Sequence, residues 1–194
     1  MKFSAMAIDG SAFLLLALLL LTAPLPWVGA ALAAAAFHEA CHWAALRLTG
    51  VRLRGMTVSA AGAVLKTGPM EPRQELWSAL AGPAGSLLLL TLLRRFPRIA
   101  LCGGIQGIFN LLPVYPLDGG RALRCLLKFR YSEQSAGHIA GIAENLTLAA
   151  IAGAGAALSF GENMGIAPVL AAVTMVMKAK MRKTPCKELF QRVQ

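Results

Sequence analysis

A succession of apolar segments, most of them nearly long enough to cross a lipid bilayer, limits what this chain can fold into. Hydrophobic residues make up 57% of the 194-residue sequence, its mean hydropathy is +0.61, and only 14% of its residues are charged. A helix needs about 20 apolar residues to span a membrane. The sequence has six such segments, at residues 11–26, 27–48, 75–93, 99–127 with a break after residue 112, 136–160 and 165–177. We therefore expect an all-α polytopic membrane protein with about six transmembrane helices.

The basic residues predict how these segments are oriented. If the amino terminus is cytosolic, all but three of the 19 Lys and Arg residues fall on the cytosolic side, as the positive-inside rule requires. The exceptions are Arg94, Arg95 and Arg98. We expect a multi-pass protein with both termini in the cytosol. The net charge of +10 is then mostly a topology signal, and because basic and aromatic residues are not interleaved on a soluble face, no nucleic-acid partner is expected.

Residues 11–26 have an alternative reading as a signal peptide, because Lys2 precedes the apolar run and small residues follow it. Asp9 and the immediate onset of a second apolar segment favour a retained membrane helix. We expect one membrane-embedded domain over residues 1–183, with its core at 29–127, followed by a short cytosolic tail at 184–194.

The second apolar segment contains the pentapeptide HEACH, which matches the zinc-protease signature HExxH. On a helix, residues i and i+4 lie on one face, so His38 and His42 can reach one tetrahedral metal ion while Glu39 faces the water on that metal. The histidines could instead pack or cap without binding metal, but a buried His-Glu-His cluster is costly in lipid unless it has a function. Cys41 points away from this face and is not expected to be a ligand.

A catalytic zinc site normally takes a third ligand from the protein. One of the two aspartates, Asp118, lies in the sequence NLLPVYPLDGG. Pro113 and Pro116 interrupt the helix there, and Gly119 and Gly120 permit close approach of backbone or substrate. The alternative is an ordinary proline-kinked loop in which Asp118 caps the next helix.

A small β-hairpin is predicted directly after the HExxH helix. Residues 51–67 contain two short β-prone runs, at 51–58 and 63–67, joined by small residues that include Gly62. The alternative is a plain cytosolic connector.

Together, HEACH and the downstream NLLPVYPLDGG resemble the site-2 protease family of intramembrane zinc metalloproteases, whose pattern is HExxH and then NxxPxxxLDG. The resemblance covers residues 29–127 specifically. The sequence AGPAG at 81–85 is also similar to a small-residue motif of that family, at which helices pack closely. Related segments in the family form a small sheet beside the active site, so an edge strand of the predicted hairpin could hold a substrate in extended form by β-augmentation.

The resemblance implies roles for five residues. One Zn²⁺ per chain would be held by His38, His42 and Asp118, with Glu39 as general base and later proton donor. Asn110 would help to hold the substrate or to stabilise the oxyanion. These roles predict a zinc metalloendopeptidase of a bacterial cell membrane that cleaves in or near a transmembrane segment of another protein.

The compact layout resembles the sporulation-associated branch of the family. That branch implies a membrane-tethered protein substrate, such as a sigma-factor precursor or an anti-sigma factor, and an inhibitory membrane partner. The longest loops have about twenty residues and only residues 178–194 follow the last predicted helix, so we expect neither a PDZ domain nor a paired CBS module within this sequence.

Two other classes of function remain open. One is a non-catalytic member of the family that binds membrane clients, and the other is a divalent metal transporter that uses the same ligands as a transit site. A transporter would need further intramembrane carboxylates, of which Glu144 is the only obvious one. His138 has no acidic neighbour in sequence and is expected to be a packing or interfacial residue.

Overall fold

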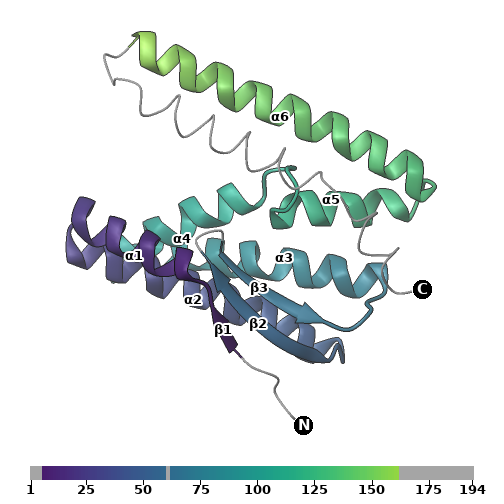
Figure 1. Cartoon of the computed structure of the whole chain (residues 1–194), viewed down its shortest axis with the longest axis horizontal. Coiled ribbons are helices and arrows are strands. Elements are labelled where there is room, and N and C mark those ends of the chain that lie inside the picture. Colours follow the sequence, from purple (N-terminus) through teal and green to yellow (C-terminus); the bar gives the residue numbers. More distant parts are fainter. Residues whose placement is uncertain (1–5, 60–61, 162–194) are drawn as a thin grey trace.

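Helices dominate the chain, and a small sheet covers one side of them (Figure 1). The computed structural model describes residues 6–59 and 62–161. In chain order its elements are β1 (Met6–Ile8), α1 (Gly10–Thr22), α2 (Leu25–Leu48), β2 (Leu53–Ser59), β3 (Gly62–Thr67), α3 (Pro72–Leu88), the 3-10 helix η1 (Leu89–Leu92), α4 (Pro97–Asn110), α5 (Asp118–Lys128) and α6 (Glu133–Gly161).

The apolar segments that lie within the described residues coincide with helices, and local signals set the ends of these helices. Asp9 caps α1 by accepting a hydrogen bond from the backbone N–H of Ser11 at 2.8 Å. Proline occupies the first turn of α2, α3 and α4, where its missing N–H costs no helical hydrogen bond. The predicted segment at 165–177 and the tail at 184–194 lie outside the described residues.

The number of membrane spans stays a prediction. Within residues 6–59 and 62–161, one helix, Pro72–Leu92, is long and apolar enough to cross a membrane. The helices α1, α4 and α5 have 13, 14 and 11 residues, short of the about 20 that a perpendicular span requires. Large apolar side chains are nevertheless exposed on several helices, among them Leu14, Leu21, Trp77, Ile105 and Leu146, which is the surface expected of a protein in contact with lipid.

The predicted hairpin is present, and a third strand extends it. β2 and β3 pair in antiparallel fashion with Ser59 opposite Gly62, and Gly62 has a φ of 109° that a residue with a side chain rarely adopts. β1 pairs with β2 in parallel, with Met6 opposite Met56. The sequence did not predict β1, because a three-residue strand has too few positions to establish a period. The fold is therefore helical with a three-stranded sheet rather than all-α with a hairpin.

Helices α2 and α3 approach closely at the small residues of the AGPAG sequence. A Cβ atom on Gly82 would overlap the His42 ring, and one on Gly85 would overlap the Cys41 thiol. Further along, α4 crosses α3 where a Cβ on Gly107 would lie 3.1 Å from the Pro83 carbonyl oxygen. The structure therefore shows the close helix packing that was predicted for this motif. α5 then packs on α3, and α6 packs on α5 (Figure 1).

We predict that Gly85→Ala destabilises the protein, because the added methyl group would force α2 and α3 apart at Cys41. Overpacking of this kind costs about 1–3 kcal/mol. The matched control is Gly137→Ala in α6, where nothing lies within 4 Å of the added Cβ, and where Ala is favoured over Gly by about 1 kcal/mol in a helix. Thermal unfolding of the two purified variants in detergent measures the difference. A Gly85→Ala variant as stable as the native chain would contradict the close contact.

Candidate active site

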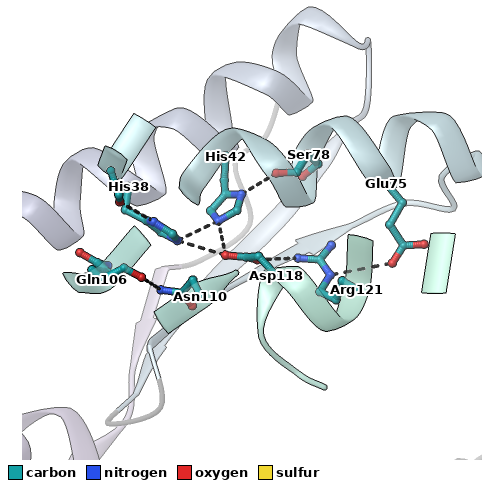
Figure 2. A network of polar contacts seen from close by, with 9 residues as sticks. His38, His42, Glu75, Ser78, Gln106, Asn110, Asp118 and Arg121 are labelled. Carbon is teal, nitrogen blue, oxygen red and sulfur yellow. Dashed lines mark hydrogen bonds and ion pairs between the residues drawn. The ribbon is translucent and has the colours of Figure 1, made fainter. Parts of the chain in front are cut away.

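The two histidines of HEACH lie on the buried face of α2, which is directed towards α3 and α5. Both side chains are almost inaccessible to solvent. Their ring centroids are 4.7 Å apart and edge-to-face, and their Nε2 atoms are 3.0 Å apart. The i and i+4 spacing has therefore brought both rings to one point, as expected for a helix (Figure 2).

Asp118 reaches the same point from α5. Its Oδ2 atom lies 3.2 Å from His38 Nε2 and 3.1 Å from His42 Nε2. Asp118 is the first residue of α5 and the N-cap position belongs to Leu117, so a capping role does not account for its carboxylate. At Gly119 and Gly120, the preceding loop's backbone packs against α5. A Cβ on Gly119 would overlap the Leu111 carbonyl, and one on Gly120 would lie 2.5 Å from the Val114 carbonyl carbon.

The three ligand atoms fit a metal ion of the size of zinc. Their separations of 3.0, 3.1 and 3.2 Å form a nearly equilateral triangle. Two ligands at the usual Zn–N and Zn–O distances in a tetrahedral site are about 3.3 Å apart. The triangle therefore matches one face of a tetrahedron, and a metal held by these three atoms would have its fourth position available. Among the residues that the structure describes, His38, His42 and Asp118 form the one group with such a spacing.

The outer nitrogens of both imidazoles are held by α3. His42 Nδ1 lies 2.6 Å from the Ser78 carbonyl oxygen, and because a carbonyl can only accept, Nδ1 must carry the proton. The Nε2 atom of neutral His42 then presents a lone pair to the centre of the triangle. His38 Nδ1 lies 2.8 Å from the hydroxyl oxygen of buried Ser86, which can accept a hydrogen bond from an N–H at Nδ1. Such partners fix the tautomer and the ring orientation of metal-binding histidines.

Ser78, Gly82 and Ser86 form one stripe of α3, because they follow one another at intervals of four residues. Ser78 and Ser86 bind the outer nitrogens, and Gly82 lies against the His42 ring. Sequence reasoning missed the two serines. Their spacing relative to Gly82 was the signal that could have indicated them.

Glu39 lies on the wall of a cavity of about 270 Å³ that opens beside the three ligand atoms. The cavity is also lined by Asn110 and Gln106 of α4, and by Tyr115. Asn110 Nδ2 donates a hydrogen bond to the Gln106 carbonyl oxygen at 3.0 Å. One N–H and the amide oxygen of Asn110 remain for other partners. Gln106 and Tyr115 were not predicted from the sequence.

The strand β3 and Arg121 also line the cavity. β3 contributes Ala63, Val64, Leu65 and Thr67. It lies at one edge of the sheet, whose strand order is β1-β2-β3, and no other strand in the described part of the chain pairs with its outer side. The predicted hairpin thus lies beside the candidate metal ligands and is more than a connector.

Three further residues discussed from the sequence lie apart from the ligand triangle. Cys41 is directed at Gly85 of α3. His138 is exposed on α6. Glu144 is buried on α6, and its carboxylate forms an ion pair with Arg124 of α5 at 3.6 Å.

Comparisons with known proteins agree with the sequence motifs. No family model matches the chain. The curated protein "Putative zinc metalloprotease Rip3" of Mycobacterium tuberculosis, found in two strains, is 34% identical over an alignment of 115 residues, and the match covers 50% of this chain and 29% of that protein. The chain therefore corresponds to less than a third of the length of these relatives.

A solved structure, the site-2 protease from Methanocaldococcus jannaschii, has the same fold. It superposes with a TM-score of 0.62 at 21% identity, over 93% of this chain and 92% of the other. The shared fold, the similarity to Rip3 and the two motifs together support the assignment of this chain to the site-2 protease family.

Proposed function

We propose that the protein is a zinc metalloendopeptidase that hydrolyses a peptide bond in or next to a membrane-embedded segment of another protein. The observation that carries this proposal is the convergence of His38, His42 and Asp118 on one point beside Glu39. Two imidazoles and one carboxylate are a ligand set that zinc favours, and three protein ligands with an open fourth position are typical of a catalytic site.

The protein's own residues would divide the chemistry between them. His38, His42 and Asp118 would hold the metal, which when bound supplies a Lewis acid that polarises the substrate carbonyl and acidifies water. Glu39 would take a proton from the attacking water and deliver it to the departing amine. Asn110, on the opposite helix of the cavity, would donate its remaining N–H to the substrate backbone or to the developing oxyanion.

Access for the substrate is the next requirement, because the peptide bonds of a helix are already hydrogen-bonded internally. An unwound segment could add to the outer edge of β3 as a further strand. In that position it would lie along the same cavity that Glu39 and Asp118 line. The position of β3 at the edge of the sheet and on the cavity wall supports this mode of binding.

The biological setting is part of the proposal. We place the protein in a bacterial cell membrane as a multi-pass protein with both termini in the cytosol, in keeping with its apolar segments and basic residues. The resemblance to the sporulation-associated branch favours a membrane-tethered sigma-factor precursor or an anti-sigma factor as the substrate, with an inhibitory membrane protein as a second partner.

The two alternative functions are less well supported. A transporter would need further carboxylates along a path for the metal ion. The candidate, Glu144, instead forms an ion pair with Arg124. A non-catalytic client-binding protein would not require a carboxylate such as that of Glu39 beside the three ligand atoms.

We predict that the purified native chain binds one zinc ion, and that His42→Ala and Asp118→Ala lose it. Loss of a direct ligand should weaken binding by more than the about 10- to 100-fold that loss of an outer hydrogen-bond partner causes. Metal content after dialysis measures this. His138→Ala, which removes an exposed histidine outside the triangle, is the matched control and should retain zinc. Retention of zinc by Asp118→Ala would contradict the assigned ligand set.

We predict that Glu39→Gln retains zinc but loses cleavage, because the amide cannot accept the proton from water. Loss of a general base lowers the rate about 100- to 10,000-fold. The measurement is cleavage of a membrane-tethered model substrate in co-expressing cells, at matched protein levels. Product at the native level from both Glu39→Gln and Asp118→Ala would exclude this proteolytic site and leave the client-binding role or the transport role.

Proline substitutions at two adjacent residues of β3 test whether the substrate pairs with the outer edge of this strand. Successive N–H groups of a strand alternate in direction, so either Val64 or Leu65 directs its N–H outward, where proline is tolerated in an edge strand. We predict that one of Val64→Pro and Leu65→Pro retains zinc yet loses most cleavage, because it removes a hydrogen-bond donor to the substrate. Val64→Thr, which keeps the N–H, is the control. Unchanged cleavage by the zinc-retaining proline variant would contradict binding at this edge.

A further inference from the structure

The two oxygen atoms of Asp118 have different neighbours. Oδ2 faces the two histidines, whereas Oδ1 lies 3.6 Å from Nη1 of Arg121, three residues further along α5. Residues i and i+3 of a helix share a face, so the helix itself brings this guanidinium beside the carboxylate. Figure 2 shows the Arg121 side chain on the side of Asp118 opposite the two imidazoles.

Arg121 is itself held from a second helix. Its Nε atom lies 3.8 Å from Oε1 of Glu75, near the start of α3. The three side chains become more exposed with distance from the candidate metal position, from 10% for Asp118 to 29% for Arg121 and 35% for Glu75. A line of alternating charges therefore connects α3 to Oδ1 of Asp118, the oxygen that does not face the histidines.

From this arrangement we propose that Arg121 is a positioning residue for the third metal ligand, and that Glu75 fixes Arg121 in turn. The inference rests on the proposed metal site. A free carboxylate can rotate or offer both oxygens to a metal. A guanidinium beside Oδ1 opposes the rotation of the carboxylate and the binding of the metal by Oδ1. It thus keeps Oδ2 directed at the point where the histidines converge. The planar, permanently charged fork of arginine suits this task better than the flexible point charge of lysine.

The charges of the cluster also favour this role. Zn²⁺ and Arg121 would together contribute three positive charges, and Asp118, Glu39 and Glu75 contribute three negative charges. A cluster without net charge is less costly to bury. Glu75 thus offsets the positive charge that Arg121 places near the metal.

Two other roles for Arg121 make different predictions. If Arg121 acted only as a nearby positive charge, its removal would strengthen metal binding, because repulsion of the cation would fall. If Arg121 contacted the substrate, its removal would raise KM and leave metal affinity unchanged, since Arg121 also lines the cavity. The positioning role predicts weaker metal binding.

Zinc competition with a chromophoric chelator, on the full chain in detergent, distinguishes these roles. We expect Arg121→Gln to weaken zinc binding about 10- to 100-fold, as is usual for loss of a partner of a metal ligand, and Arg121→Lys to recover part of that loss. Glu75→Gln should weaken zinc binding less than Arg121→Gln, and the double variant should bind zinc no more weakly than Arg121→Gln alone. Such non-additivity shows that Glu75 acts through Arg121.

The control is Arg73→Gln, which removes an exposed arginine from the same turn of α3 as Glu75 and should leave zinc binding unchanged. Unchanged or tighter zinc binding by Arg121→Gln, or additive losses in the double variant, would overturn the inference. The proposed function would still stand in that case if the native chain bound zinc and cleaved the model substrate. Failure of the native chain to bind zinc would instead refute the metal site and this inference with it.

Discussion

The contact between α2 and α3 determines where the candidate metal ligands lie. The absence of a side chain at Gly82 lets α3 approach the His42 ring, and this approach brings the Ser78 carbonyl and the Ser86 hydroxyl within hydrogen-bond distance of the two imidazoles. Each hydrogen bond directs an Nδ1 atom towards α3 and an Nε2 atom towards α5. One stripe of small residues therefore sets the distance between the helices and the orientation of both rings.

The residues around the ligands form a layered polar cluster within apolar surroundings. Imidazoles and a carboxylate are at the centre, and the polar groups of α3 and Arg121 contact their outer atoms. No buried side-chain nitrogen or oxygen lacks a hydrogen-bond partner in the part of the chain that the structure describes. This matters in a membrane, because the bilayer core holds no water that could form a hydrogen bond with an unsatisfied polar group. The buried polar neighbours of the candidate ligands thus have hydrogen-bond partners of their own.

Residues whose spacing is local could be predicted from the sequence, and residues that depend on tertiary contacts could not. His38 and His42 follow from the helical period, the hairpin from its β-prone runs and Gly62, and Asp118 from the motif that contains it. Ser78, Ser86 and Arg121 carry a much weaker signal. The two serines lie four residues on either side of Gly82, but serine on an apolar helix and arginine near a helix end are common for many reasons. β1 was missed on similar grounds, since its pairing with β2 joins residues about fifty positions apart.

The short helices α4 and α5 illustrate why hydropathy alone is a poor guide to membrane spans in such a protein. At 1.5 Å per residue, 14 and 11 residues extend about 21 and 17 Å, whereas the hydrocarbon core is about 30 Å thick. An uninterrupted helix through residues 99–127 would span the bilayer, but it would bury Asp118 in the middle of a continuous helix, away from any helix end. The break at the two prolines instead makes Asp118 the first residue of a new helix, where the helix dipole favours a carboxylate. The interruption that shortens the apolar segment is therefore the same feature that brings the third candidate ligand to the histidines.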